Sequence, residues 1–519
     1  MKLAEASVMQ GLDRRTMELG VPGVVLMENA GKGTVDLLTE HFGDLAGQTV
    51  AIVAGPGNNG GDGFVIARHL LQLRAKPAVY CLVDPAKIKG DARINHDSVL
   101  NLKISVYYIT KESGLTVCRA ALVHSTIIMD ALFGTGLKRR VEGLFAMVIE
   151  CLNQAGRPIV SVDIPSGLDS DTGEPLGACV YATLTATYGL AKPGHVTYPG
   201  VEYTGILKVV DIGIPPQVVN EAAIKIDLLQ KKEMVGLIPN RSLTSHKGSF
   251  GHVMLLAGSQ GKTGAAILAA RAALRSGVGL VSLGVPQKLN DIFEKSLIEA
   301  MTIPLASEYF IGIDDMHAIK SALHGMDSLV VGPGIGTDPE TSALVAKLYA
   351  DVDLPMVIDA DAITALAREE VALSHHAPRI FTPHPGEMAR LTGKTVKEIQ
   401  GNRRLISSDF AVQNGVVVVL KGAATVIAAP DGRVAINPTG NAAMAVGGMG
   451  DVLSGLIGAL IAQGLNAWDA SCLGVYVHGL AADQIVAAHD LPFGILASEV
   501  ADEIPLAFRE IIKGTKLIR

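Results

Sequence analysis

Short apolar runs recur along the chain, and most lead through a glycine-rich loop into a stretch with helical spacing. The clearest case is residues 49–73, TVAIVAGPGNNGGDGFVIARHLLQL, in which β-branched residues precede the glycines. The same pattern occurs in STIIMDALFGTGL, RPIVSVDIPSGLDS, HVMLLAGSQGKTGAAILAARAAL, DSLVVGPGIGTDP, PMVIDADAITAL and RIFTPHPGEMARL. Continuous apolar strands that alternate with helices predict mostly parallel sheets covered on both faces, so the fold class is α/β.

The pattern is interrupted between Pro215 and Lys247, where the chain becomes more charged and runs through PNRSLTSHKG. The strand–loop–helix series restarts at Gly251. We therefore expect two α/β domains, residues 1–220 and 230–519. The length of 519 residues agrees with this division, because a single domain usually holds roughly 100–200 residues.

Composition and charge narrow the classes of function. A chain that is 49% hydrophobic and 18% charged is not disordered, and a net charge of −7 argues against a nucleic-acid binder. The five cysteines form no C-x-x-C pair, which disfavours a disulfide framework or a thiolate zinc site. The N-terminus lacks the apolar core of a signal peptide, and no uncharged apolar run approaches the roughly 18 residues of a membrane span. We expect a cytoplasmic protein with small-molecule partners and no nucleic-acid or membrane partner.

The loop after the first apolar run carries an unusual number of polar side chains. Residues 55–60 match the G-x-G-x-x-G pattern, and Asp84 follows a little over twenty residues later, as in dinucleotide-binding turns. Asn58, Asn59 and Asp62 add more polar groups than a pyrophosphate needs. The simpler alternative is a tight turn whose Asn or Asp side chains cap the following helix.

Three further loops of the first half end apolar runs. Asp130 follows TIIM, and Asp163 and Ser166 follow IVSV. Residues 134–140 combine glycines with three cations, which suits a phosphate or, alternatively, a solvated surface cluster. Strand ends of a parallel sheet meet at one edge, so we expect Asn59, Asp130, Asp163 and Ser166 to converge. Their oxygens suit a hard cation, and a carboxylate there can act as an acid or base.

The densest signal of the second half is NPTGNAAMAVGGMGDVLSG. Gly447, Gly448 and Gly450 precede Asp451, where an apolar helix begins. Successive glycine N–H groups at a helix N-terminus can hold transferring phosphoryl oxygens, and a carboxylate there can accept a proton from the hydroxyl being phosphorylated. The alternative is that Asp451 only caps the helix.

Other loops of the second half are less specific. Lys421–Thr425 follows the apolar strand VVVVL and suits nucleotide phosphates or a structural role. His384 lies between two prolines, so it is either a rigid ligand contact or an exposed turn residue. Asp359 and Asp361 suit a nucleotide, Mg²⁺ or a helix cap. AGSQGKTG lacks the first glycine of a P-loop and is not one.

Together and in order, these motifs resemble the bifunctional NAD(P)H-hydrate repair enzymes. LMENAG, GPGNNGGDG, DALFGTGL, DIPSGLD and AKPGH are similar to the NAD(P)H-hydrate epimerase domain, a Rossmann-like three-layer fold. AGSQGKTGAAILAARAALRSGVGL, GPGIG, DADA, TPHPGEMARL, KGAAT and NPTGN…GGMGDVLSG are similar to the ribokinase-like, ADP-dependent dehydratase domain. The resemblance implies that the chain epimerises (R)- and (S)-NAD(P)H hydrate and dehydrates the S form. ADP would be consumed to AMP and phosphate, and NAD(P)H would be restored.

The resemblance also implies roles for matching residues. The hydrate in the epimerase would contact Asn58, Asn59, Gly60, Gly61, Asp62, Gly134, Thr135, Gly136, Leu137, Lys138, Arg139, Arg140 and Asp163, with Asp163 as our candidate acid–base group. Potassium would be held by Asn59, Asp130 and Ser166. The hydrate in the dehydratase would contact Ala265, Gly334, His384 and Asp451, with Asp451 as the base. ADP (or ATP), with Mg²⁺, would be bound by Lys421, Gly422, Ala423, Ala424, Thr425, Asn441, Gly447, Gly448 and Gly450.

Three other functions stay open at this point. The GPGNNG turn alone suits an NAD-dependent dehydrogenase, although no group for hydride transfer to a second substrate is evident. The second half alone suits a ribokinase-type small-molecule kinase with a non-catalytic N-terminal half. A third alternative is a nucleotide-binding module in the first half with only the second domain active. For the repair enzyme we expect NADHX and NADPHX as substrates and a homo-oligomer as the assembly.

Overall fold

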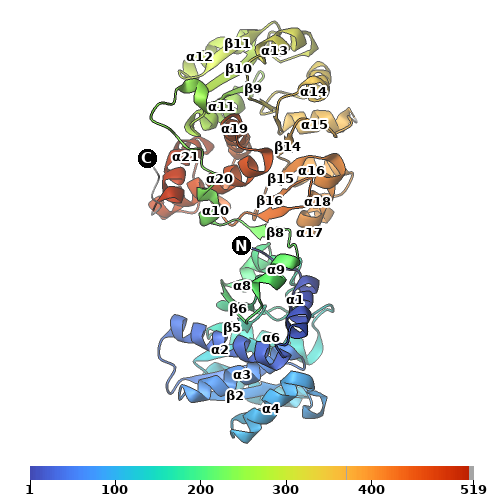
Figure 1. The fold of residues 1–519 in the computed structure, drawn as a ribbon, viewed down its shortest axis with the longest axis vertical. Coiled ribbons are helices and arrows are strands. Elements are labelled where there is room, and N and C mark those ends of the chain that lie inside the picture. The colour runs from blue at the N-terminus through green and yellow to red at the C-terminus, as the bar shows by residue number, and fades with distance from the viewer. Residues whose placement is uncertain (370, 514–519) are drawn as a thin grey trace. The chain divides into compact units, whose positions relative to one another are not determined.

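The computed structural model describes residues 1–369 and 371–513, and it separates into two compact units (Figure 1). The N-terminal domain comprises Lys2–Ile226, and the C-terminal domain begins at Asp227 and includes Met1. Each domain is built around its own sheet, so the expected class of two α/β domains is confirmed. No helix among the described residues is both long and apolar enough to cross a membrane.

The N-terminal sheet has seven parallel strands in the order β3-β2-β1-β4-β5-β6-β7. This is the doubly wound order of Rossmann-like folds, and strand order reverses between β1 and β4. Ligands of such sheets bind at the carboxyl ends of the strands near that point. The strands are β1 Thr49–Ala54, β2 Lys76–Cys81, β3 Ser105–Tyr108, β4 Ile127–Ala131, β5 Ile159–Val162, β6 Leu184–Tyr188 and β7 Ile206–Val210.

Helices cover both faces of this sheet because its central strands are apolar on both sides. Val50 and Ile52 pack with α2, α3 and α4, whereas Ala51 and Val53 pack with α5 and α6 on the other face. The turn from β1 into α3 is tight, since a Cβ at Gly55 would collide with the Leu132 carbonyl. The helices are α1 Ala6–Glu18, α2 Gly23–Phe42, α3 Asn58–Gln72, α4 Gly90–Asn101, α5 Leu115–His124, α6 Gly143–Gln154, α7 Pro193–Val196, α8 Gly200–Thr204 and α9 Pro216–Glu221, with 3-10 turns η1 Pro85–Lys87 and η2 Glu112–Gly114.

The C-terminal sheet has ten strands in the order β11-β10-β9-β12-β13-β14-β15-β16-β17-β8. Strands β11 to β15 are parallel, but β15, β16 and β17 pair antiparallel. The motif series therefore predicts the parallel part and misses the antiparallel end. The strands are β8 Ile226–Leu228, β9 His252–Leu256, β10 Leu280–Pro286, β11 Met301–Leu305, β12 Ser328–Val331, β13 Met356–Ile358, β14 Arg379–Phe381, β15 Val417–Leu420, β16 Val426–Ala428 and β17 Val434–Ile436.

Two apolar layers enclose this sheet. Helices α11, α19, α20 and α21 bury one face, and α13 to α18 bury the other. Helix α19 is buried nearly all round, as the apolar run after Asp451 predicts, and Gly455 lets it approach the Ala269 carbonyl of α11. The helices are α10 Lys231–Val235, α11 Thr263–Arg275, α12 Asn290–Ser296, α13 Met316–Ala322, α14 Pro339–Asp351, α15 Asp361–Arg368, α16 Pro385–Thr392, α17 Val396–Gly401, α18 Arg403–Asn414, α19 Met449–Ala462, α20 Ala467–His489 and α21 Ala497–Ile512, with 3-10 turns η3 Lys247–Phe250, η4 Gln287–Leu289, η5 Ile313–Asp315 and η6 Ala442–Met444.

Candidate active sites

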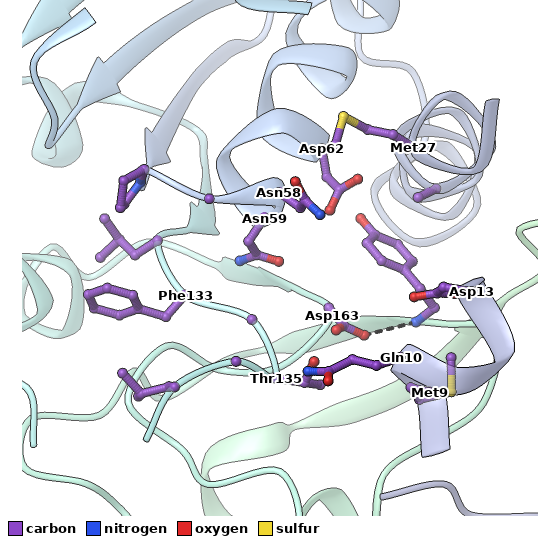
Figure 2. A pocket seen from close by; sticks show the side chains of 18 of the residues that line it. Met9, Gln10, Asp13, Met27, Asn58, Asn59, Asp62, Phe133, Thr135 and Asp163 are labelled. Carbon is purple, nitrogen blue, oxygen red and sulfur yellow. Dashed lines mark hydrogen bonds between the residues drawn. The ribbon is translucent and has the colours of Figure 1, made fainter. Parts of the chain in front are cut away.

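A cavity of about 1060 Å³ lies at the carboxyl ends of β1, β4, β5 and β6 in the N-terminal domain (Figure 2). Of the predicted substrate contacts, Asn58, Asn59, Asp62, all of residues 134–140 and Asp163 line it. The side chains of Lys138 and Arg140 are exposed, but they line this cavity and are not a surface cluster away from it. The structure thus brings most of the predicted substrate-binding residues to one place.

Gly60 and Gly61 do not line the cavity. A Cβ at Gly60 would collide with the Gly55 carbonyl, and one at Gly61 would lie 2.7 Å from the Met27 side chain. These glycines therefore serve the turn and the packing of α3 on α2. The alternative that Asn side chains cap α3 is wrong, because the residue at the cap position is Gly57 and no side chain makes a cap hydrogen bond there.

Asp84 caps the short η1 turn and lies outside the cavity. It is therefore not placed to bind a ribose, as the acidic residue of a dinucleotide-binding turn would be.

Asp163 lies directly after β5 and has a left-handed backbone, with φ +65°. Such a conformation in a residue other than glycine costs energy and is typical of functional sites. Its Oδ1 accepts hydrogen bonds from Lys192 Nζ at 2.5 Å and from the Tyr188 N–H at 3.2 Å. Burial raises the pKa of Asp163, but the Lys192 ammonium lowers it further, so the net shift is downward. Asp163 is therefore ionised at neutral pH.

A buried histidine holds Lys192 and Asp163 in place. The Nδ1 atom of His195 accepts a hydrogen bond from the backbone N–H of Lys192 at 3.0 Å. The ring proton is therefore on Nε2, which donates to the backbone carbonyl of Asp163 at 3.0 Å. Burial and the Lys192 charge lower the pKa of His195 to about 3. The ring is neutral and acts as a fixed support, and the AKPGH motif thus builds the base of this site.

The three predicted potassium ligands converge beside the loop that follows β4. Asp130 is fully buried and its carboxylate accepts hydrogen bonds from Ser161 Oγ, Ser166 N and Ser166 Oγ at 2.6–2.8 Å. The Asn59 amide faces Gly134, and its Nδ2 is buried without a hydrogen-bond partner among the described residues. With its amide group rotated by 180°, Asn59 would present its oxygen at this position. Carboxylate, hydroxyl and amide oxygens fit a hard cation.

Asp13 is a cavity residue that the motifs do not reveal. It lines the cavity from α1, one turn after Met9, on the side of the helix that buries Met9, Leu12 and Thr16. Burial raises its pKa to about 6, and the neighbouring Asp163 charge adds to the shift. The sequence signal that could have identified Asp13 is an acidic residue on the core-facing side of an amphipathic helix.

Asp62 and Tyr188 complete the polar wall of the cavity. Burial, followed by the Asp163 and Asp13 charges, raises the pKa of Asp62 well above its ordinary value. Tyr188 OH lies 3.0 Å from Thr34 Oγ1. Five acidic residues line the cavity, Asp13, Asp62, Asp91, Glu142 and Asp163, beside the one buried ammonium of Lys192. The pKa values of Asp13 and Asp62 are raised, whereas that of Asp163 is lowered.

In the C-terminal domain, Asp451 is the third residue of α19, whose cap is Gly448 with a left-handed backbone. The capping alternative for Asp451 is wrong, since its side chain makes no cap hydrogen bond. Burial raises the pKa of Asp451 to about 7; the Asp359 charge adds to this and Lys421 opposes it. A base with that pKa is poised for proton transfer near neutrality.

Lys421 lies at the centre of an acidic cluster near Asp451. Its Nζ donates to Asp359 Oδ1 at 2.7 Å and lies 3.9 Å from Glu387 Oε2. Asp359 also accepts from Thr382 Oγ1, but its Oδ2 is buried with no partner within the described ranges. Gly450 permits the approach of Lys421, because a Cβ there would lie 3.1 Å from Nζ. These oxygens fit a hard cation such as Mg²⁺.

The predicted hydrate contacts of this domain fall into two places. Gly334 and Ala265 are neighbours, since a Cβ at Gly334 would lie 2.9 Å from that of Ala265. His384 is half exposed, caps α16 and accepts the Gly386 and Glu387 N–H groups at Nδ1. Because Glu387 also lies beside Lys421, His384 belongs to the edge of the acidic cluster.

The predicted nucleotide residues divide in a similar way. Lys421 and Gly450 belong to the acidic cluster around Asp451. Asn441 instead caps η6 and donates to Asp483 Oδ1 at 2.8 Å, so its side chain holds the loop. Gly422 and Thr425 form a turn closed by the Thr425 hydroxyl on the Gly422 carbonyl at 2.9 Å.

Comparisons with known proteins cover both domains. Residues 253–506 match the family model for NAD(P)H-hydrate dehydratase, and residues 23–194 match the model for the YjeF-related protein N-terminus. The bifunctional NAD(P)H-hydrate repair enzyme of Moorella thermoacetica is 42% identical over 100% of this chain and 98% of that protein. The enzyme of the same name from Thermofilum pendens is 38% identical over 98% of this chain and 97% of that protein. A Bacillus subtilis ADP/ATP-dependent NAD(P)H-hydrate dehydratase, co-crystallised with ATP/Mg²⁺, is 31% identical, with 56% of this chain and 99% of that chain covered and a TM-score of 0.49.

Proposed function

The chain belongs to the family of bifunctional NAD(P)H-hydrate repair enzymes, and on that premise we propose how its two sites divide the repair. The protein is an NAD(P)H-hydrate epimerase and an ADP- or ATP-dependent dehydratase. The N-terminal domain, about residues 1–220, interconverts the R and S hydrates, and the ribokinase-like domain, about residues 230–519, dehydrates the S form. The observation that carries the proposal is the 42% identity to a named repair enzyme across the whole chain.

In the dehydratase, Asp451 acts as the base. The hydroxyl of the hydrate gives its proton to the Asp451 carboxylate while its oxygen attacks the terminal phosphorus of the nucleotide, whose P–O bond breaks so that AMP leaves from ADP, or ADP from ATP. The ring nitrogen then supplies an electron pair, and phosphate leaves with the electrons of the C–O bond. Transfer of the neighbouring C–H proton to the departing phosphate restores the dihydropyridine. Water alone is a poor leaving group, which is why the nucleotide is needed.

The residues around Asp451 support the nucleotide. The N–H groups of the cap Gly448 and of Gly450 in the first turn of α19 provide an anion-binding helix terminus. Asp359, with its unpartnered Oδ2, is the residue we assign to Mg²⁺; bound there, the metal would neutralise phosphoryl charge. Lys421 is held by Asp359 and orients toward the phosphates when the nucleotide binds. Ala265, Gly334 and His384 are assigned to the hydrate.

In the epimerase, Asp163 is the base, because Lys192 keeps it ionised. Residues 134–140 bring Lys138, Arg139 and Arg140 to the cavity, where they suit the phosphates of the dinucleotide. Asn59, Asp130 and Ser166 are assigned to potassium, which would orient the hydrate beside Asp163. Self-association stays a prediction, which light scattering of the purified chain tests.

One assay tests the repair function. The purified chain is incubated with mixed (R)- and (S)-NADPH hydrates, K⁺, Mg²⁺ and either ADP or ATP, and absorbance of restored NADPH is followed. Full recovery of both epimers is expected. Recovery of the S form alone would leave the first domain as a binding module, and no recovery would favour a dehydrogenase or a kinase.

A further inference from the structure

We propose that Asp13 on α1 is a second proton-transfer group of the epimerase site. It acts as the acid where Asp163 acts as the base. The proposal rests on the epimerase function assigned above. It concerns a residue that none of the sequence motifs includes. Asp13 lies in the first helix of the chain and lines the cavity, where Figure 2 shows it near Asp163.

The first argument is the position of the Asp13 side chain. It occupies the core-facing side of α1, where Met9, Leu12 and Thr16 are buried. Its Oδ1 is buried, and no described residue provides it with a hydrogen bond. A buried carboxylate oxygen without a partner is costly in a folded protein. Its exposed neighbour Arg15 pairs with Glu18 and Glu221 rather than with Asp13.

The second argument is the charge balance of the cavity. Asp13 is faced by Asp163 after β5, Lys192 before α7 and Asp62 on α3. Tyr188 at the end of β6 lines the same wall. Lys192 donates to Asp163 at 2.5 Å, and the other cations that line the cavity, Lys138, Arg139 and Arg140, have exposed side chains. Among the described residues no buried ammonium is therefore paired with Asp13 or Asp62. Like charges in one site cannot all ionise, so protons remain on this pair near neutrality.

Exposure distinguishes Asp13 from Asp62. Asp62 is buried in the first turns of α3, with 8% of its surface exposed, whereas Asp13 is only partly buried. A group that exchanges protons in every catalytic cycle needs access to the substrate and to solvent. Burial raises the pKa of Asp13 to about 6, which keeps a useful fraction protonated near neutral pH while Asp163 is ionised.

Epimerisation at a carbon that carries both a hydroxyl and the ring nitrogen needs one base and one acid. Asp163 takes the hydroxyl proton, the C–O bond becomes a carbonyl, and the C–N bond breaks with its electron pair on nitrogen. Asp13 gives its proton to that nitrogen. After rotation of the aldehyde the nitrogen attacks its other face, Asp13 takes its proton back, and Asp163 returns the other proton to oxygen. No electron, proton or water is gained or lost overall.

The test uses the full-length chain without nucleotide, so that the dehydratase is idle. Conversion of purified (R)-NADPH hydrate to the S form is followed by chromatography against the spontaneous rate. Asp13→Asn is expected to lower kcat by about 10²–10⁴ with KM changed less than about threefold. Asp13→Glu, which keeps the carboxyl group, should retain measurable activity. Glu18→Gln, on the exposed side of the same helix, is the matched control and should match the wild type.

The pH profile separates proton transfer from a structural role. The wild-type rate should fall as pH rises through about 6, because Asp13 loses the proton it must donate. A flat wild-type profile from about pH 5 to 8 overturns the proposal even if Asp13→Asn misfolds. Asp13→Asn with a rate within about threefold of wild type also overturns it. A wild-type chain that does not convert the R hydrate at all refutes the epimerase function itself.

Discussion

Replacing Asp451 by asparagine should abolish most dehydratase turnover while making the folded protein more stable. The substitution keeps the size of the side chain and removes its capacity to accept a proton. Asp451 neither caps α19 nor bonds through its carboxylate to any described residue. The helix should therefore remain intact, and changes in rate and stability report on the charge itself.

The expected loss of turnover follows from the role of Asp451 as a base, and the expected gain in stability follows from its burial. Loss of a general base lowers turnover by about 10²–10⁴, equivalent to roughly 3–5 kcal/mol of transition-state stabilisation. The pKa is raised from 3.8 to about 7, so folding becomes less favourable as pH rises between these values, because the ionised form is disfavoured only in the folded state. The shift corresponds to at most ~4 kcal/mol, and partial solvent exposure reduces the expected gain to about 1–2 kcal/mol.

The assay measures NADPH formation from (S)-NADPH hydrate with saturating nucleotide and Mg²⁺, and denaturant unfolding at about pH 5 and pH 8. The gain in stability of Asp451→Asn should be present at pH 8 and shrink at pH 5, because at pH 5 the folded state carries a protonated Asp451 and no longer holds a buried charge. Asp469→Asn is the matched control, because Asp469 is the third residue of α20 as Asp451 is of α19. It should leave turnover unchanged.

A turnover of Asp451→Asn within about tenfold of wild type would refute its role as the base. Equal stability of variant and wild type at pH 8 would refute the argument from burial. Wild-type turnover should rise as pH increases through about 7, since the ionised carboxylate is the active form. A turnover that does not change between about pH 6 and 8 would contradict that assignment.

Three further variants test the remaining assignments. Asp163→Ala should leave (S)-hydrate repair intact and strand the R form, and equal consumption of both epimers would exclude Asp163 as the base. Lys421→Met leaves Asp359 as a buried, unpaired charge, so unfolding free energy should fall by about 3–5 kcal/mol; the pH midpoint of turnover should move upward, because Lys421 lowers the pKa of Asp451. Asp130→Asn removes the charge from the predicted potassium site, so the R-to-S rate should lose its dependence on KCl, and an unchanged KCl titration would contradict the site.

The parallel parts of both sheets could be predicted from the sequence because each buried strand is a continuous apolar run that ends in glycines. The antiparallel end of the C-terminal sheet could not be predicted in the same way. Strands β16 and β17 are three residues each and carry no glycine-loop-helix signature after them. Their pairing depends on contacts along β15, which local periodicity does not encode.

The sites were predictable where chemistry is confined to one loop and unpredictable where it depends on distant partners. Asp163 and Asp451 stand at strand or helix ends within recognisable motifs. The partner of Asp163 is Lys192, which lies twenty-nine residues later and is almost fully buried. The left-handed backbone of Asp163 and the cavity position of Asp13 also emerge only when the helices pack.

The two domains differ in strand order, yet each pairs a lysine, fully buried in the first domain and partly buried in the second, with a carboxylate that follows a strand. Lys192 pairs with Asp163, and Lys421 pairs with Asp359. In each case another aspartate within reach of the same lysine has a raised pKa: Asp13 in the first domain and Asp451 in the second. In the first domain the Lys192 ammonium lowers the pKa of its own partner Asp163, and in both domains the lysine also lowers the pKa of the neighbouring aspartate, which burial raises. Removing either lysine should therefore raise the pKa of the neighbouring aspartate, which moves the pH optimum of its reaction rather than only weakening the fold.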